Sequence, residues 1–297
     1  MKKGKNGFGY ALLLPSIILF LMISVYPLLN GIGMSFTNKS LMRPEETEIV
    51  FFDNYIRLFQ DSEFLGSLAF TLTYTVLIVG ISYVAGLALA LILNRDIRGR
   101  AVFRTIFLLP WVIPSVVAMT NWSWLLNDQF GFINTFLEKM NLIEKPILFL
   151  ADYDLIRPVV ILISVWKAMP FMMITMLAGL QSVPQDLYEA ASIDGAGFFR
   201  SLKSITLPLI WPVSLISLVL NFIWTINNFE NIWLLTGGGP NGFTFTLPIL
   251  SYYTAFYRSN LSYASTIATT LIICMLFVGA VYTVIKRITG RERRRRG

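Results

Sequence analysis

Four side chains that can bind a polar ligand recur at regular spacing in the apolar stretch after Pro208. They stand at positions i, i+3, i+4 and i+7: Asn221, Trp224, Thr225 and Asn228. A helix would place all four on one face. Asparagine donates and accepts hydrogen bonds, which suits sugar hydroxyl groups, and a sugar ring can stack on tryptophan. The alternative is contact between helices, in which Asn and Thr hydrogen-bond to neighbouring spans.

Lys167 is a second candidate, because it lies about ten residues inside another apolar stretch. At 1.5 Å per residue this depth is about 15 Å, close to the middle of a ~30 Å hydrocarbon core. A charge at that depth needs a wet cavity or a partner. Lys167 could therefore contact substrate in a cavity, or pair with Glu230, a carbonyl group or a partner subunit. Three threonines that share a face of the last apolar stretch are weaker candidates: Thr266, Thr269 and Thr270.

The composition excludes most catalytic chemistry. Of the 297 residues, 55% are hydrophobic and 14% are charged, whereas soluble domains carry about 25% charge. The chain has no histidine and one cysteine, Cys274, so an intrachain disulfide or a Cys-ligated metal cluster is impossible. It also lacks the Gly-x-x-x-x-Gly-Lys motif of phosphate loops. We predict an integral membrane protein that is not an enzyme and binds neither a metal nor a cofactor.

Six apolar stretches are long enough for the roughly 20 residues that a helix needs to cross a bilayer. They are about Tyr10–Met34, Leu68–Leu93, Phe103–Leu125, Pro158–Leu180, Leu209–Leu235 and Ala264–Ile285. The first exceeds the apolar core of a signal peptide, so we expect it to be retained as a span. Pro110 and Pro114 disfavour a straight third helix, and buried neighbours must then satisfy its freed carbonyl groups.

The basic residues indicate the orientation of these spans. They gather at both termini, around Arg95–Arg104 and at Arg200 and Lys203, which predicts that both termini are cytoplasmic. The net charge of +7 could suggest nucleic acid, but this distribution follows the ends of the spans. We interpret the tail Arg291–Arg296 as an anchor near anionic lipid headgroups and expect no nucleic-acid partner.

Two long loops fall on the opposite, outer side, at Phe36–Ser67 and Leu126–Arg157. Loops of this size can carry small helices. They could form a rim on which an extracytoplasmic protein docks, or they could be plain surface loops. A third outer segment, Gly237-Gly238-Gly239-Pro240, predicts a sharp turn that leads into a re-entrant or interfacial segment.

The segment Pro184–Pro212, which we call the knob, is polar and lies between two apolar stretches. Pro184 suits the first turn of a helix, which we predict over Gln185–Ser192. Asp194 and Gly195 should stop this helix, because glycine tolerates a left-handed conformation. A second short helix follows over about Gly197–Ile205, and Pro208 marks the step into the next span.

The knob resembles the EAA loop of the inner-membrane permease subunits of binding-protein-dependent ABC importers. The matching residues that we expect to couple to an ATPase are Glu189, Ala190, Ala191, Asp194, Gly195, Ala196 and Pro208. In that family this loop is a coupling helix that docks into a cleft of the cytoplasmic ATPase. The resemblance implies that Glu189 offers its carboxylate to a basic partner and that Asp194 caps the second helix. The alternative is an ordinary amphipathic surface hairpin.

Three further segments resemble the same family. They are Phe52-Asp53-Asn54-Tyr55, the pattern from Arg104 to Pro114, and Thr236-Gly237-Gly238-Gly239-Pro240 with Thr244, Leu247, Tyr252 and Phe256. The last of these resembles the outer loop of sugar-type permeases. The resemblance implies an all-α type I importer permease with six transmembrane helices. It also implies a single domain over 1–297, with a core at about 66–286 and a coupling loop at 184–208.

The implied function is import of a sugar or oligosaccharide across a prokaryotic cell membrane. The implied partners are a second permease subunit, a cytoplasmic ATPase dimer that uses ATP, and an extracytoplasmic solute-binding protein. The alternative is a secondary transporter driven by an ion gradient. Such a transporter needs carboxylates within the membrane, and only Glu230, near the end of a span, is available. A membrane enzyme would lack catalytic groups.

Overall fold

The structure is a computed structural model that describes the backbone of residues 5–296 and the side chains of residues 12–286. Lys2 and Lys3, and the side chains of Lys5 and Arg291–Arg296, lie outside these described residues. The regular elements of the described chain are all helices, and its β-structure is limited to two isolated bridges, which confirms the predicted all-α class. It divides into two compact units: one comprises the residues up to Gly66 with Leu247–Cys274, the other Ser67–Thr246 with the residues from Met275 onward.

Each of the six predicted spans has a counterpart among the described residues. Five helices are long and apolar enough to cross a membrane: Leu12–Met34, Ser62–Leu93, Ile156–Gln181, Phe198–Ile226 and Leu261–Lys286. The sixth is a pair, Arg100–Val112 and Ser115–Leu125, whose axes are bent by 92°. Helix α5 continues through Pro110 to Val112 and the break falls at Ile113 and Pro114, which confirms that the third span is not straight.

The first unit holds the first span and the outer loop that follows it. Its elements are α1 (Lys5–Phe20), a π-helix (Leu21–Val25), α2 (Tyr26–Met34), a 3-10 turn (Pro44–Glu46), α3 (Asp53–Leu58), α13 (Leu247–Phe256) and the first part of α14 (Leu261–Arg296). The long loop Phe36–Ser67 therefore carries a small helix, as a loop of this size can. Asn54 Nδ2 fixes α3 to the end of the first span, because it donates to the carbonyl oxygens of Ser35 at 2.9 Å and Thr37 at 2.7 Å.

Charged side chains hold the same loop to the start of α14. Arg258 donates to both carboxylate oxygens of Glu63 at 2.6 and 2.8 Å, and this hydrogen bonding raises the pKa of Arg258. Asp61 accepts a 2.6 Å hydrogen bond from the Tyr263 hydroxyl. Burial alone would raise the pKa of Asp61, but hydrogen bonds from Tyr263 and the backbone N–H groups of Glu63 and Phe64 bring it below its usual value.

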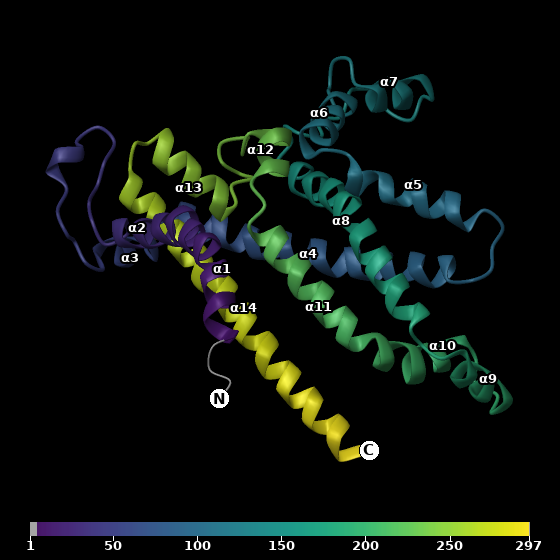
Figure 1. Cartoon of the computed structure of the whole chain (residues 1–297). Helices are drawn as coiled ribbons and strands as arrows, with labels where there is room; N and C mark the ends of the chain where they lie inside the picture. The colour runs from purple at the N-terminus through teal and green to yellow at the C-terminus, as the bar shows by residue number, and fades with distance from the viewer. Residues whose placement is uncertain (1–4, 297) are drawn as a thin grey trace. The chain divides into compact units, whose positions relative to one another are not determined.

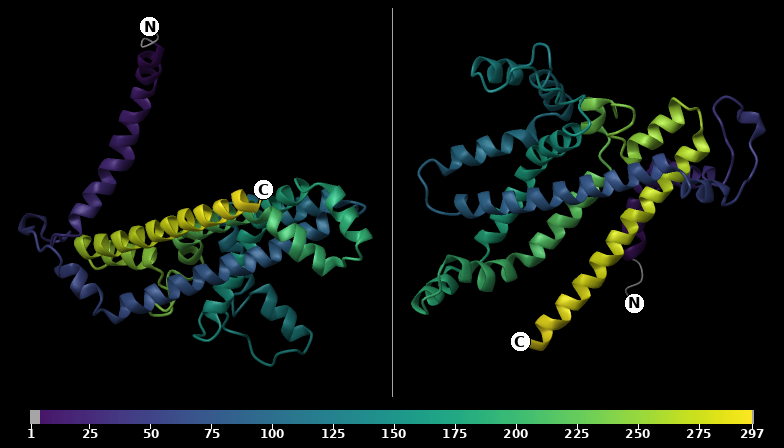
Figure 2. Two further views of the ribbon diagram at one scale, coloured as in Figure 1. Left: turned by 90° about the horizontal axis from the view of Figure 1, so that it is seen from below. Right: turned by 180° about the vertical axis from the view of Figure 1, so that it is seen from behind.

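The second unit contains the remaining helices. They are α4 (Ser62–Leu93, from Ser67 on), α5 (Arg100–Val112), α6 (Ser115–Leu125), α7 (Phe132–Lys139), α8 (Ile156–Gln181), α9 (Gln185–Ile193), α10 (Phe198–Ser201), a π-helix (Leu202–Thr206), α11 (Leu207–Ile226) and α12 (Glu230–Thr236). Helices α8 and α11 pack together and run side by side toward α9 and α10 (Figures 1 and 2). The second long loop carries α7, as such a loop can.

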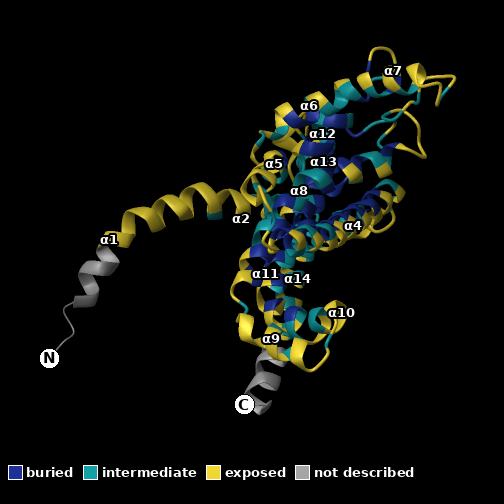
Figure 3. Cartoon of the chain, turned by 90° about the vertical axis from the view of Figure 1, so that its right-hand side faces the viewer, coloured by how far each residue is buried: buried dark blue, intermediate teal, exposed yellow. Residues whose placement is uncertain are grey.

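Helix α8 is the most buried span of the second unit (Figure 3). The methionines at its centre, Met172, Met173 and Met176, are inaccessible to solvent. Gly86 lets α4 approach them closely. A Cβ at this position would lie 2.6 Å from Met172 Cβ and 2.8 Å from the backbone nitrogen of Met173, so a side chain larger than hydrogen does not fit.

The predicted extent of the fifth span was wrong. Helix α11 ends at Ile226 rather than Leu235, and α12 begins separately at Glu230. The amide side chain of Asn228 explains the new start, because its Oδ1 accepts a 3.1 Å hydrogen bond from the N–H of Asn231. This bond satisfies an N–H of the first turn of α12, which has no partner within that helix.

Candidate functional site

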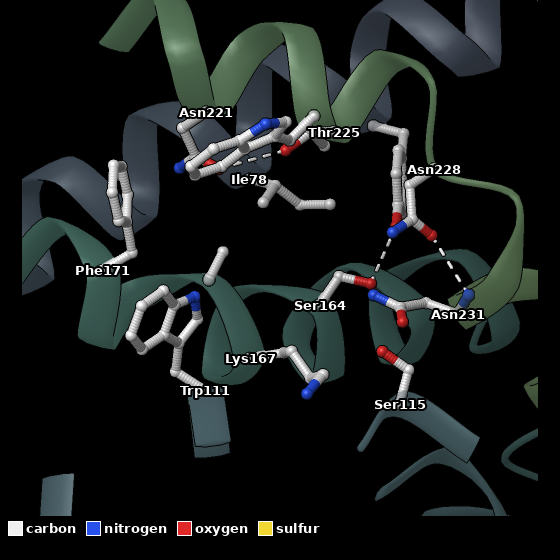
Figure 4. A pocket seen from close by; sticks show the side chains of 13 residues that line it. Ile78, Trp111, Ser115, Ser164, Lys167, Phe171, Asn221, Thr225, Asn228 and Asn231 are labelled. Carbon is white, nitrogen blue, oxygen red and sulfur yellow. Dashed lines mark hydrogen bonds between the residues drawn. The ribbon is translucent and has the colours of Figure 1, made fainter. Parts of the chain in front are cut away.

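All five predicted substrate-path residues line one pocket of about 170 Å³ in the second unit (Figure 4). Lys167 comes from α8, whereas Asn221, Trp224 and Thr225 come from α11. Asn228 reaches the pocket from the link before α12, so its placement there does not depend on the helical face that the spacing predicted. The remaining lining residues were not predicted from the sequence: Tyr74, Ile78, Trp111, Ser115, Ser164, Ala168, Phe171 and Asn231.

One wall of the pocket is aromatic. The ring of Phe171 lies 4.9 Å from that of Trp224 and 6.3 Å from that of Trp111, measured between centroids. These three rings come from α8, α11 and α5, which are far apart in the sequence. Phe171 is one helical turn after Lys167, a spacing that could have indicated that both side chains face the same way.

Two amide atoms in the pocket have no hydrogen-bond partner. They are Nδ2 of Asn221 and Oδ1 of Asn231, and their side chains are nearly buried at 4% and 6% exposure. The other amide atom of Asn221, Oδ1, accepts a 3.3 Å hydrogen bond from Thr225 Oγ1. A buried polar atom without a partner costs about 1–3 kcal/mol. A ligand with hydroxyl groups, which both donate and accept, would supply both missing partners.

Lys167 uses its ammonium group on backbone carbonyls of the bent third span. Its Nζ donates to the oxygen of Pro110 at 3.1 Å and to that of Ile113 at 2.6 Å. Among the described residues no ion pair joins Lys167 to Glu230. Of the partners that the sequence left open for this lysine, the structure therefore shows the carbonyl group. Lys167 also lines the pocket, so it faces a cavity as well.

The three threonines of the last span donate their hydroxyl groups to carbonyls of their own helix, and Thr266 donates also to the carbonyl of Ser35 at 3.3 Å. Thr266 donates to the carbonyl of Ser262, Thr269 to that of Ser265 and Thr270 to that of Thr266, at 2.7 to 2.9 Å. None of the three lines the pocket. The structure thus separates these weaker candidates from the other five.

The knob begins as predicted, with a helix at Gln185–Ile193 that stops before Gly195, whose φ is +73°. Its second half is different. The expected separate helix is the start of the fifth span, because α10 continues through the π-helix into α11 without a break. In that π-helix the N–H of Leu207 bonds to the carbonyl of Leu202, five residues back. The wider turn accommodates Pro208, which lacks an N–H.

The predicted cap by Asp194 is not observed. Helix α10 follows Gly197, and no side chain caps it. Asp194 is instead the C-terminal cap residue of α9, where its backbone N–H bonds to the carbonyl of Ala190. The physical reason is the turn at Gly195, which places Phe198, the first residue of α10, four residues beyond Asp194 and leaves the first turn of α10 without a capping side chain.

Much of the knob around α9 and α10 is exposed (Figure 3), and its exposed residues include apolar as well as acidic ones. Glu189, Asp194 and Pro208 are exposed. Ile193 and Phe199 are exposed at 87% and 81%, although no motif in the sequence predicts an exposed apolar surface there. On the inner side of the knob, the hydroxyl groups of Tyr188 and Thr206 share a 2.9 Å hydrogen bond. The seven predicted coupling residues thus lie on a projecting helix pair that has an exposed apolar surface.

The glycine-rich segment forms the predicted sharp turn. Gly237 and Gly238 have φ values of +59° and +85°, which favour glycine. The hydroxyl groups of Thr236 and Thr244 close the turn at 2.8 Å. Arg157, at the start of α8, donates through Nε to the carbonyl of Phe243 at 2.9 Å.

Comparison with known proteins points to one family. The profile of the family "Binding-protein-dependent transport system inner membrane component" matches residues 82–295. The trehalose/maltose transport system permease protein MalF of Thermococcus litoralis is 35% identical over 252 residues, which cover 85% of this chain and 84% of that protein. The trehalose transport system permease protein SugA of Mycobacterium tuberculosis is 31% identical, over 95% of this chain and 89% of that protein.

A solved structure has a similar fold. It is a bacterial alginate ABC transporter in complex with an alginate pentasaccharide-bound periplasmic protein. The matching chain superimposes with a TM-score of 0.82 and 27% sequence identity, and the match covers 96% of each chain.

Proposed function

This chain belongs to the family of binding-protein-dependent transport system inner membrane components, and from that premise we propose that it imports a sugar or oligosaccharide as a permease subunit of an ABC importer. Members of this family are membrane components of transporters and are not enzymes themselves. Relatives named for trehalose, maltose and alginate transport support a carbohydrate substrate.

The pocket is the observation that carries this proposal. It combines an aromatic wall with an unpaired amide donor on Asn221 and an unpaired amide acceptor on Asn231. A sugar ring has the matching chemistry, because its C–H face stacks on aromatic rings while its hydroxyl groups donate and accept. Asn221, Trp224, Thr225 and Asn228 would then contact the substrate during its passage.

The knob would couple this pocket to a separate ATPase, since the chain itself has no phosphate loop. Glu189 would pair with a basic residue of the ATPase, and Ala190, Ala191, Asp194, Gly195, Ala196 and Pro208 would shape the docking surface. The exposed side chains of Ile193 and Phe199 support this role, because water-exposed apolar groups of this size favour a protein partner. ATP would be bound and hydrolysed by that partner and not by this chain.

The proposed assembly has four further features. Both termini and the knob face the cytoplasm, as the basic residues predict. The whole chain forms one permease domain with its core at about 66–286. A second permease subunit completes the translocation path, and an extracytoplasmic solute-binding protein delivers the sugar to the outer loops. The related alginate transporter, whose structure includes a periplasmic binding protein, supports the last feature.

The secondary-transporter alternative is not favoured. Among the described candidate spans the one acidic residue is Glu63, at the end of α4, and it is paired with Arg258. Glu230 lies beyond the end of the fifth helix and starts α12. An ion-coupled transporter would need carboxylates deeper in the membrane.

Reconstitution into proteoliposomes tests the proposal. The chain, its partner permease and its ATPase are reconstituted with the binding protein outside, and uptake of labelled trehalose, maltose and alginate oligosaccharides is measured. We expect uptake of at least one of them that depends on ATP at the ATPase. Uptake that a proton or sodium gradient drives without the ATPase would refute the proposal.

Charge reversal tests the coupling role separately. We expect Glu189→Arg to lose co-purification with the ATPase. Asp186→Arg is the matched control, because Asp186 is an exposed acid on the same helix but outside the matching residues. If both variants retain the ATPase, the knob is only a surface hairpin.

A further inference from the structure

We infer that Lys167 is a positioning residue that holds the bend of the third span and thereby shapes the pocket for an uncharged sugar ring. The role in shaping a sugar pocket rests on the proposed transport function, whereas the contact between Lys167 and the third span does not depend on it. It assigns to this lysine a structural bond across two spans in place of an ionic contact with substrate.

The bend leaves carbonyl groups that the helix cannot satisfy. In a continuous helix the oxygen of Pro110 would accept from the N–H of residue 114, but Pro114 has none. Ile113 lies between the two helices with an extended backbone, so its carbonyl also lies outside regular helix. Lys167 Nζ donates to both oxygens, at 3.1 and 2.6 Å. One side chain of α8 thus supplies a donor both to the Pro110 carbonyl, which Pro114 leaves without its helical partner, and to the carbonyl of Ile113.

Aromatic residues of α8 near Lys167 contact the third span on each side of the bend. The ring of Phe171 lies 6.3 Å from that of Trp111, which belongs to α5. The ring of Trp166 meets that of Trp122, which belongs to α6, edge to face at 5.5 Å. Lys167 lies between these two aromatic contacts and bonds to the bend itself.

The bend in turn places two pocket residues. Trp111 is near the end of α5 and Ser115 is at the start of α6, and both line the pocket beside Lys167, facing the α11 residues (Figure 4). Straightening the third span would move one or both away. The position of these walls therefore depends on the contact between Lys167 and the backbone.

The contact between Lys167 and the two carbonyl groups also reduces the positive charge that a ligand in the pocket would experience. Lys167 is the only charged residue that lines the pocket. Two of its three N–H donors point to carbonyl oxygens, whose dipoles offset the ammonium charge. The groups left for a ligand are the neutral amides of Asn221 and Asn231. A neutral ring fits these groups, whereas an acidic sugar would have to compete with the backbone for the lysine.

The first experiment measures the bend directly. Spin labels at positions 102 and 124, both exposed on the two helices, report the distance between the ends of the pair in a Cys274→Ser background. At 1.5 Å per residue these positions lie about 33 Å apart in a straight helix and about 23 Å apart around a right-angle bend. We expect Lys167→Met to shift the distance toward the straight value and Lys167→Arg to keep it.

The second experiment measures uptake of a neutral and an acidic sugar, trehalose and an alginate oligosaccharide, by the reconstituted importer. We expect Lys167→Met to lower the maximal rate for any transported sugar about tenfold, because both the bend and the pocket walls shift. Lys167→Arg should restore most of the rate. Loss of acidic-sugar uptake alone, with the label distance unchanged, would show that the lysine reads substrate charge and would overturn the inference.

Removal of Pro114 distinguishes positioning from mere stabilisation. Pro114→Ala restores an N–H that can bond to the Pro110 carbonyl, so the double variant with Lys167→Met should regain thermal stability. Its label distance should stay long and its transport low. Recovery of transport in the double variant would mean that Lys167 only stabilises the fold. If wild type transports none of the sugars, the label distances still decide whether Lys167 holds the bend, independently of the proposed function.

Discussion

The knob and the pocket present opposite kinds of side chain to their surroundings. On the knob, Ile193 and Phe199 expose apolar surface, although the segment is polar and projects from the spans. In the pocket, Asn221 and Asn231 bury polar atoms inside an apolar helix bundle and leave two of them unpaired. Each region thus has groups without partners. The exposed apolar side chains of Ile193 and Phe199 on the knob are not covered by other parts of the described chain, and two amide atoms of the pocket have no hydrogen-bond partner.

The two regions also differ in how the sequence encodes them. The residues that resemble the coupling loop all lie in one short segment, from Glu189 to Pro208. The pocket is instead lined by several helices, each of which contributes one to four residues: α4, α5, α6, α8, α11 and α12. A docking surface for a protein can be built on one helix pair, whereas enclosing a small ligand requires several helices to converge.

The largest effect should come from adding a charge to the knob. Ile193→Asp places a carboxylate in the proposed docking surface, and loss of a central apolar contact typically costs 2 kcal/mol or more, about thirtyfold in affinity. We expect ATPase co-purification and ATP-dependent uptake to be lost. Ile193→Leu is the control and should retain both. Full activity of Ile193→Asp would show that this exposed apolar surface has no partner and would break the comparison.

Removal of the unpaired amide donor of Asn221 should weaken sugar binding in the pocket without affecting ATPase binding at the knob. Asn221→Leu keeps a similar volume but cannot donate to a sugar, which costs about 1–3 kcal/mol. We expect the KM for uptake to rise about tenfold while ATPase co-purification is unchanged. Ser217→Ala, one turn earlier, is the control, because the hydroxyl of Ser217 is bonded to the Val213 carbonyl. Equal defects in the two variants would indicate general damage to α11.

The aromatic wall should tolerate a change of ring better than its loss. Trp224→Phe keeps a face for stacking, whereas Trp224→Ala removes it together with the contact to Phe171. Stacking contributes about 0.5–1.5 kcal/mol beyond buried area. We therefore expect a rise in KM of several fold for Trp224→Ala and a smaller one for Trp224→Phe. The reverse order would argue that Trp224 only fills space.

The smallest effect is expected outside the pocket. Thr270→Ala removes a hydroxyl group that already bonds to the Thr266 carbonyl of its own helix. Removing a satisfied hydroxyl of this type changes stability by about 1 kcal/mol or less, so uptake should remain within about twofold of wild type. A large loss of uptake would show that a polar residue need not line the pocket to act in transport.

Much of this arrangement followed from the sequence. The number of spans, the bend at Pro110 and Pro114, and the first helix of the knob all depend on local chemistry: apolar length, missing N–H groups and a glycine turn. The five substrate-path residues were found because polar side chains are rare inside apolar stretches. Whether they contact substrate, and whether the knob binds an ATPase, remain predictions.

Other features depend on contacts that a sequence does not show. Lys167 bonds to backbone carbonyls 54 and 57 positions earlier, and every residue has a carbonyl, so no residue type marks these partners. Helix α11 ends at Ile226, and Asn228 supports the start of α12 through one side-chain bond. The apolar pattern of Leu209–Leu235 does not show this break, so the stretch reads as one span. Asn231 was missed for the same reason, since it lies in the short helix that follows this break.

Gly86 has a mechanical consequence. Because Gly86 has no side chain, the backbone of α4 packs directly against the Cβ atom of Met172 in α8. Neither helix can roll about its own axis there without driving a Cβ atom into the other, so around this crossing the two should behave as one rigid lever. Lys167 and its aromatic neighbours hold the bend after α5, so we expect flexing in the π-helix before α11, where regular α-helix is interrupted. Cysteine pairs across the crossing should therefore cross-link equally well in ATP-bound and ATP-free importer, whereas pairs across the π-helix should not.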